Sequence, residues 1–424
     1  MRLHAVLISI VLIGIFLVLA GLAWTWRPAI EPISSGAKQV ADAKTIRQGA
    51  ELATIGNCSD CHTTKSGASY AGGLALDASP YGTIYSSNIT PDPETGIGKW
   101  SEEAFRRAMH EGVDREGRHL YPAFPYDHFT HATDQDLHAL YAFLMSQQAV
   151  RSTVPSNDLK FPFNIRLLVA GWKILFLSRG SLEPDSSQSP EWNRGRYLVE
   201  GLGHCSSCHT PRNLFGAEKK YSAYAGAVVD GWYGPSLNSS IFASHKWSAD
   251  QLAEYLSTGW HKMHGAAAGP MSDVAKNLSR ASRENVDAMA IYIASLSNDP
   301  KAPTAPAQDK PVVNATSEVV AIYTGACAKC HNDRNDVGPS KALPLSLSTA
   351  VHQADSANAV RAILYGIEAY RGSGGPYMPA FDGILTDSQI ASVAEYVRAR
   401  YSGGPQWTDI NKEITKARQK GGQP

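Results

Sequence analysis

Three copies of one pentapeptide decide how this sequence is organised. They read C-S-D-C-H at 58–62, C-S-S-C-H at 205–209 and C-A-K-C-H at 327–331. Two cysteines separated by two residues can each form a thioether with a vinyl group of one haem, and the histidine that follows can ligate the iron. We therefore predict three haem c groups. The thioether residues would be Cys58, Cys61, Cys205, Cys208, Cys327 and Cys330, and the axial ligands His62, His209 and His331.

Two other kinds of site also use C-x-x-C, namely structural zinc sites and thioredoxin-like redox pairs. A zinc site needs four ligands, usually from two clusters at short spacing, whereas the three pairs here lie far apart in the sequence. A redox pair needs no adjacent histidine. All six cysteines belong to the pentapeptides, so none remains for a structural disulfide. Haem attachment explains the pattern best.

The N-terminal stretch 5–26 carries no charged side chain. A helix of about 20 apolar residues can span a bilayer. A cleaved signal peptide is the alternative, with a cleavage site at 21–23, but its apolar region is usually shorter, about 7 to 15 residues. Trp24, Trp26 and Arg27 are typical of a membrane interface. We predict a transmembrane anchor over 1–26 that places the haem domains on the periplasmic side of a bacterial inner membrane.

Each pentapeptide follows a short helical pattern, and each repeat closes with an amphipathic helix. The closing helices show apolar residues at i, i+3, i+4 and i+7, which form one stripe. Thr133, Ser282 and Thr386 are candidate N-caps, and Thr386 with Gln389 forms a capping box. The apolar stripes are Leu137, Leu140, Tyr141 and Leu144; Val286, Met289, Ala290 and Ile293; and Ile390, Val393, Ala394 and Val397.

These paired helices resemble the first and last helices of class I cytochrome c, which cross closely beside the haem. Gly49 and Gly195 stand where a small residue permits the crossing, and the third repeat has no glycine there. The predicted fold is mainly α: a transmembrane helix followed by three class I cytochrome c domains. The domains cover 40–152, 191–300 and 313–403, with linkers at 153–190 and 301–312 and a polar tail without apolar periodicity at 404–424.

An iron that only passes electrons needs a second axial ligand, and methionine raises its potential. Met378, in G-G-P-Y-M-P-A-F, and Met271, in A-G-P-M-S-D, are the candidates in the third and second repeats. The alternative for each is a core methionine that fills a gap. Met263 and His264 are further candidates in the second repeat.

The first repeat departs from this pattern because Phe124 stands where methionine is expected, and phenylalanine cannot ligate iron. His128, four residues further on, is the preferred sixth ligand. The other possibilities remain open: His119, His131, Met109, Met145, or an open iron. An open iron would suit a haem enzyme, the rival from another class of protein.

Nearly the whole chain resembles the three-haem cytochrome c subunits of membrane-bound bacterial dehydrogenases. The resemblance rests on the three haem motifs, on S-S-N-I-T-P-D-P-E-T-G-I-G-K-W at 86–100, and on G-P-M and M-P-A-F. The loop Y-P-A-F-P-Y-D-H-F at 121–129 looks more like the subunits that serve molybdenum hydroxylases acting on aldehydes or N-heterocycles. Subunits of quinoprotein alcohol and flavin-dependent sugar dehydrogenases instead carry Y-P-A-M-P-Y.

The resemblance implies an electron-transfer subunit without a catalytic site of its own. Its partners would be a catalytic molybdopterin subunit and a small iron–sulfur subunit, and electrons would leave to ubiquinone or to a downstream cytochrome or oxidase. A free-standing cytochrome relay is a further alternative. A formal net charge of zero argues against nucleic acid as a partner. The apolar stretch 161–177 is either an interfacial helix or a packed linker helix.

Overall fold

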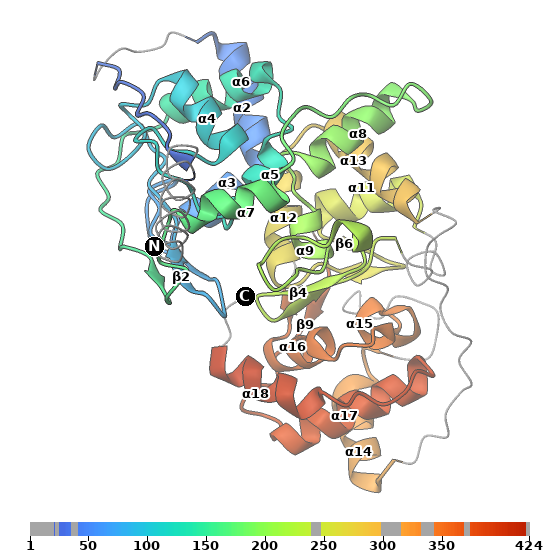
Figure 1. Cartoon of the computed structure of the whole chain (residues 1–424). Coiled ribbons are helices and arrows are strands. Elements are labelled where there is room, and N and C mark those ends of the chain that lie inside the picture. Colours follow the sequence, from blue (N-terminus) through green and yellow to red (C-terminus); the bar gives the residue numbers. More distant parts are fainter. Residues whose placement is uncertain are drawn as a thin grey trace, which may run out of the picture. The chain divides into compact units, whose positions relative to one another are not determined.

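The computed structural model describes residues 21, 25–34, 41–238, 247–297, 315–331, 343–368 and 374–420. The chain is rich in helices (Figure 1) and forms two compact units. The first unit comprises 1–53 and 58–182, and the second comprises 54–57 and 183–424. No described helix is long and apolar enough to cross a membrane. The anchor predicted over 1–26 lies almost entirely outside the described residues, and the linker at 301–312 lies wholly outside them.

The first unit contains the first haem motif. Its strands form a small antiparallel sheet in the order β1-β2-β3, and the 153–182 segment belongs to this unit rather than forming a separate linker. Its elements are α2 (Ala43–Ile55, of which the first unit holds residues 43–53), α3 (Cys58–His62), β1 (Ala75–Asp77), β2 (Gly82–Tyr85), α4 (Glu102–Glu111), α5 (Tyr126–Phe129), α6 (Asp134–Met145), β3 (Asp158–Leu159) and α7 (Leu168–Phe176).

The predicted helix crossing is present in the first unit. A Cβ built on Gly49 of α2 would lie only 1.9 Å from the carbonyl oxygen of Ala139 on α6, so the two backbones touch. Thr133 caps α6 by accepting a hydrogen bond from the Asp136 amide, as predicted. Gln48 then donates to the Asp136 carboxylate at 2.8 Å and fixes the two helices against each other.

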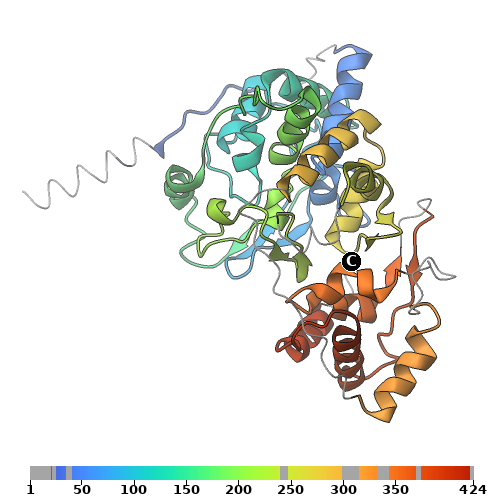
Figure 2. The same cartoon turned by 90° about the vertical axis from the view of Figure 1, so that its right-hand side faces the viewer.

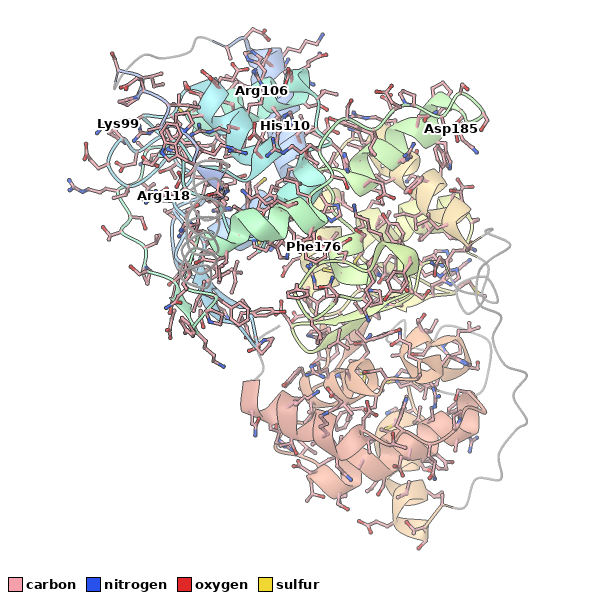
Figure 3. All side chains as sticks on the ribbon, viewed as in Figure 1. Lys99, Arg106, His110, Arg118, Phe176 and Asp185 are labelled. Atoms are coloured by element: carbon pink, nitrogen blue, oxygen red, sulfur yellow. The ribbon has the colours of Figure 1, made fainter. Side chains whose placement is uncertain are left out.

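Polar contacts join α4 to the start of α6. Arg106 of α4 (Figure 3) forms an ion pair with Asp134 in the first turn of α6, with 3.0 Å between nitrogen and oxygen. One turn further along α4, Nε2 of His110 lies 2.8 Å from the carbonyl oxygen of Ala132. These contacts hold the closing helix of the first repeat from a second side.

The second unit contains the other two haem motifs. The second repeat comprises α8 (Pro190–Glu200), α9 (Ser206–His209), the 3₁₀ turn η1 (Lys220–Ser222), β4 (Ala227–Val229), β5 (Trp232–Gly234), α11 (Ala249–Thr258), β6 (Trp260–His261), β7 (Gly265–Ala266), α12 (Pro270–Leu278) and α13 (Arg283–Leu296). The third comprises α14 (Ser317–Ile322), the π-helical turn η2 (Tyr323–Cys327), η3 (Leu345–Leu347), α15 (Thr349–His352), α16 (Ala357–Tyr365), β8 (Ile367–Glu368), β9 (Tyr377–Met378), α17 (Asp387–Tyr401) and α18 (Ile410–Lys420).

The helix crossing recurs in the second repeat with the same geometry. A Cβ on Gly195 of α8 would lie 1.9 Å from the carbonyl oxygen of Ala288 on α13. Ser282 caps α13, and Thr386 forms the predicted capping box with Gln389 at the start of α17. In the third repeat, which has no glycine at this position, Tyr323 packs on Tyr396 of α17 with ring centroids 5.1 Å apart.

The expectation of a polar tail at 404–424 is wrong for its described part. Residues 410–420 form α18, which packs in the third repeat with α16 and α17 (Figures 1 and 2). Trp407, Ile410 and Ile414 are buried in the same core cluster as Val360 and Leu364. The apolar residues of this segment are few, but they recur at helical spacing and find a core, which is enough to order the helix.

Candidate haem-attachment sites

The histidine of each haem motif is held in the same way. Its Nδ1 lies within hydrogen-bond distance of a backbone carbonyl oxygen that comes from a loop further along the chain. The three pairs are His62 with Ser87 at 2.6 Å, His209 with Pro235 at 2.7 Å and His331 with Leu343 at 3.0 Å.

This shared contact determines which ring nitrogen can bind a metal. A carbonyl oxygen only accepts hydrogen bonds, so the proton must sit on Nδ1. The lone pair is then on Nε2, the nitrogen left for a metal, and the carbonyl fixes the orientation of the ring. Burial lowers the pKa of all three imidazoles, which favours the neutral form that ligates iron.

The first two histidines are also fixed through their own backbone. The amide of Gly72 donates to the carbonyl of His62 at 2.8 Å, and the amide of Gly226 donates to that of His209 at 2.8 Å. Both glycines have φ in the left-handed region, at 71° and 87°, where a side chain would be strained. The two repeats therefore present their histidines with the same local structure.

The cysteines suit thioether formation better than either alternative. None of the six forms a disulfide. Burial raises the pKa of Cys58 and Cys205 to about 12 and that of Cys327 to about 11, so these groups are thiols at neutral pH. A reactive redox pair requires a lowered thiol pKa. Two thiols with an adjacent histidine whose Nε2 is oriented form the donor set that a haem c requires, and the residues present fit that group.

Sequence reasoning missed the carbonyl partners, since a backbone oxygen leaves no mark in a sequence. In the first repeat one signal did exist, the polar stretch at 86–100. The buried Asn88 side chain donates to Thr95 at 3.0 Å and to the carbonyl of Val150 at 2.7 Å, and it accepts from Thr90. This network holds the loop that presents the Ser87 carbonyl to His62.

The predicted methionine ligands lie in different settings, and their role stays a prediction. Met378 is half-buried in β9, where it pairs with Ile367 of β8. Met271 lies in the first turn of α12 and packs against the core of the second repeat. Of the two further candidates, Met263 is exposed, and the His264 ring stacks on the Trp247 ring with 3.6 Å between ring centroids.

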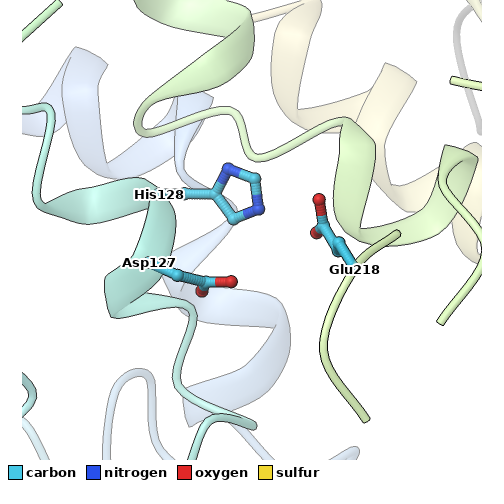
Figure 4. A group of neighbouring side chains, drawn as sticks. All are labelled: Asp127, His128 and Glu218. Atoms are coloured by element: carbon cyan, nitrogen blue, oxygen red, sulfur yellow. The ribbon is translucent and has the colours of Figure 1, made fainter. Parts of the chain in front are cut away.

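In the first repeat, His128 lies on the short helix α5 (Figure 4) and is buried. Phe124 packs against Phe129 with ring centroids 5.2 Å apart. The alternative His119 has both ring nitrogens in contact with the protein, because Nε2 lies 2.9 Å from the Thr25 carbonyl and Nδ1 lies 3.1 Å from Nζ of Lys173. Ligation through either ring nitrogen of His119 would break the contact that this nitrogen makes.

The structure also locates the remaining candidates for the sixth ligand in the first repeat. Met109 is buried within α4, and Met145 is half-buried at the end of α6. His131 has its Nδ1 2.6 Å from the carbonyl oxygen of Gly180. The sixth ligand of the first repeat stays a prediction.

Comparison with known proteins identifies the family of the chain. The family model described as "Cytochrome c" matches residues 46–148, and the model described as "Cytochrome C oxidase, cbb3-type, subunit III" matches 314–397. The gluconate 2-dehydrogenase cytochrome c subunit of Pantoea cypripedii is 34% identical over 402 residues, covering 89% of this chain and 90% of that protein. The chain belongs to the family of dehydrogenase cytochrome c subunits. As a cytochrome c subunit it transfers electrons and is not the catalytic component.

Two further relatives of this cytochrome c subunit bear on its partner. The fructose dehydrogenase cytochrome subunit of Gluconobacter japonicus is 33% identical over 412 residues, with 90% of this chain and 84% of that protein covered. A subunit of the nicotinate dehydrogenase of Pseudomonas putida is 44% identical over 418 residues, covering 96% of this chain. This chain spans only about a third (35%) of that protein's length.

Proposed function

We propose that this cytochrome c subunit carries three haem c groups and conducts electrons from a dehydrogenase to the respiratory chain. The observation that supports the count is the shared geometry of His62, His209 and His331, each with Nδ1 on a backbone carbonyl and with two cysteines just before it. When bound, the haem iron supplies a one-electron redox centre at each motif. The chain's own part is to orient the imidazole, hold the thioethers and exclude water.

The favoured partner is a dehydrogenase of the molybdopterin and iron–sulfur type that oxidises an aldehyde or an N-heterocycle. Identity with the nicotinate dehydrogenase subunit is 44%, against 34% and 33% with the gluconate and fructose dehydrogenase subunits. The loop at 121–129, which carries Phe124, also favours this partner because it resembles the subunits that serve molybdenum hydroxylases. A quinoprotein alcohol dehydrogenase or a flavin-dependent sugar dehydrogenase is the alternative partner.

The proposed location is the bacterial inner membrane, with the haem domains on the periplasmic side. The support is the uncharged stretch 5–26, long enough for an anchor, together with the covalent haem motifs. Electrons would leave to ubiquinone or to a downstream cytochrome or oxidase.

Purification of the complex from native membranes tests this assignment. A tag at the C-terminus of this chain should bring down a large subunit with molybdenum and a small subunit with acid-labile sulfide. Flavin or a quinone cofactor in place of molybdenum would contradict the favoured partner but keep the electron-transfer role. Recovery of the chain alone under mild detergent would contradict the dehydrogenase assignment.

A further inference from the structure

Helix α7 is apolar on its outer face and carries its one charged residue on its inner face. Lys173 is buried, at 7% exposure, whereas Leu168, Ile174 and Leu175 are exposed, at 54%, 60% and 69%. A helix on the surface of a soluble protein has the opposite distribution. The outer face of α7 is therefore built for contact with something other than water.

The exposed apolar area continues into the segment before the helix. We call the whole set the α7 surface. It combines several large apolar side chains that are close together in the sequence. Single exposed apolar residues are normal on a protein surface, but contiguous patches mark contact sites. Its members are Phe161, Phe163, Ile165, Leu167, Leu168, Ile174 and Leu175.

The orientation of α7 is fixed by the contacts of Lys173. Its Nζ donates to the carbonyl oxygens of Glu111 at 2.7 Å and Gly112 at 2.5 Å, which lie at the C-terminal end of α4. A cation is favourable at this end of a helix. The Tyr126 ring lies 4.8 Å away, and Trp172 of α7 packs edge-on against the same ring. The apolar face cannot turn inward without breaking these contacts.

The same contacts hold the end of the N-terminal stretch. His119 lies between Lys173 and Thr25, with Nδ1 3.1 Å from Nζ of Lys173 and Nε2 2.9 Å from the Thr25 carbonyl oxygen. Arg166, two residues before α7, donates to the His119 carbonyl at 3.0 Å. The chain therefore leaves the uncharged stretch 5–26 directly beside α7, and Trp26 at its end is exposed, at 69%.

Residues just after Thr25 are fixed to α4 and to the segment 112–119 that follows it. Arg107 donates to the Pro28 carbonyl at 2.7 Å, and the Ile30 amide donates to the Arg115 carbonyl at 2.8 Å. A Cβ on Gly117 would lie 2.1 Å from the Arg27 carbonyl oxygen, so the backbones are in contact. Residues 25–30 and α7 are thus held by α4 and the segment 112–119 that follows it, all within the first unit.

We propose that the α7 surface lies in the interfacial layer of the lipid bilayer, as a second membrane contact beside the N-terminal anchor. This rests on the proposed membrane location. Lipid is the occupant because the α7 surface adjoins the point where the chain's own uncharged stretch ends, and that stretch has the length of a membrane span. An amphipathic helix in this position lies in the plane of the interface with its apolar side chains among the acyl chains. The first unit would then sit directly on the membrane.

Spin labelling of the full-length holoprotein tests the proposal. Haem attachment uses all six native cysteines, so Leu175→Cys gives a single labelling site. Ile384→Cys is the matched control, because Ile384 is equally exposed, at 69%, in the third repeat. In vesicles of phosphatidylethanolamine and phosphatidylglycerol, the label at 175 should collide more with oxygen than with a water-soluble nickel chelate. The label at 384 should show the reverse preference.

Leu168→Cys, about two turns earlier on the same face, should behave like Leu175→Cys. If both labels favour the nickel chelate as strongly as the label at 384, the α7 surface faces water and the proposal is wrong. Shielding from both reagents that appears only with the dehydrogenase subunits bound would also overturn it, in favour of a protein contact. Flotation of the same samples with the vesicles tests the N-terminal anchor separately.

Discussion

The side chain of Asn358 pairs with the backbone of Tyr233 in both directions. Its Nδ2 donates to the Tyr233 carbonyl at 2.8 Å, and the Tyr233 amide donates to its Oδ1 at 2.8 Å. Asn358 lies on α16 of the third repeat and Tyr233 on β5 of the second. One side-chain amide thus occupies the edge of the β4–β5 hairpin and fixes the orientation of these two repeats within the second unit.

Replacing Asn358 with alanine should loosen this contact. Two hydrogen bonds are lost, each with a net contribution of about 0.5 to 1.5 kcal/mol. We expect faster hydrogen exchange at the Tyr233 amide and slower electron equilibration between the second and third haems. Asn411→Ala, at an exposed position of α18, is the control. Unchanged exchange at Tyr233 would show that the pairing is not what holds the repeats together.

A glycine-to-alanine substitution should have contrasting effects at a helix crossing and at a position away from one. Gly195→Ala places a methyl group 1.9 Å from the Ala288 carbonyl oxygen, so α8 and α13 must separate. Overpacking of this kind costs about 1 to 3 kcal/mol, occasionally more. Gly171→Ala on α7 meets no atom within 4 Å and should leave stability unchanged or raise it. Thermal unfolding of the two variants measures the difference, and equal melting temperatures would contradict the close crossing.

The features that sequence alone predicted are local ones. The haem motifs, the caps Thr133, Ser282 and Thr386, and the small residues Gly49 and Gly195 each follow from a short pattern with one physical reason. The position of α18 was missed because its few apolar residues acquire meaning only against α16.

Contacts between distant residues could not be predicted. Ser87, Pro235 and Leu343 act through backbone oxygens, which any residue possesses. The inward direction of Lys173 depends on the end of α4, which is far away in the sequence. Hydropathy left the 161–177 segment open between an interfacial and a packed helix, since both are apolar.

The attachment of α18 depends on a buried ion pair. Arg361 of α16 and Glu413 of α18 are 2% and 4% exposed, with 3.3 Å between Nη1 of the arginine and Oε2 of the glutamate. Glu413→Ala leaves the guanidinium buried without its carboxylate, which costs about 3 to 5 kcal/mol. We expect the third repeat to unfold at lower denaturant concentration. Lys416→Ala removes only the half-exposed partner of Glu413 and serves as the control. A third repeat of unchanged stability in Glu413→Ala would show that the pair contributes little.

The first haem should have the lowest potential of the three. Imidazole donates more strongly to ferric iron than a thioether, so ligation by His128 lowers the potential relative to haems with methionine. His128→Ala should turn one haem high-spin and open it to carbon monoxide, whereas His138→Ala, at an exposed position, should change no haem spectrum. Three low-spin haems with unchanged potentials in His128→Ala would exclude His128. Rapid carbon monoxide binding by the wild type would favour a haem enzyme.

Lys173 should make stability depend on pH. Burial lowers its pKa from 10.5 to about 7. Between these values the unfolded chain binds one proton more than the folded chain, so the stability of the wild type should rise with pH. The slope should approach 1.4 kcal/mol per pH unit, roughly the limit for one proton. Denaturant titrations of the wild type and Lys173→Met at pH 7 and pH 9 give the difference, and parallel pH profiles would contradict the burial of a titrating ammonium.

The central claim is that each of the three motifs holds one haem through two thioethers. Thioether bonds survive unfolding, so the mass of the denatured intact chain gives the count directly. The mass should equal that of the polypeptide plus three haems. Cys58→Ala with Cys61→Ala, and the corresponding pairs at 205 and 208 and at 327 and 330, should each remove one haem. A wild-type mass with fewer than three haems, or a pair of substitutions that leaves the mass of bound haem unchanged, would contradict the claim.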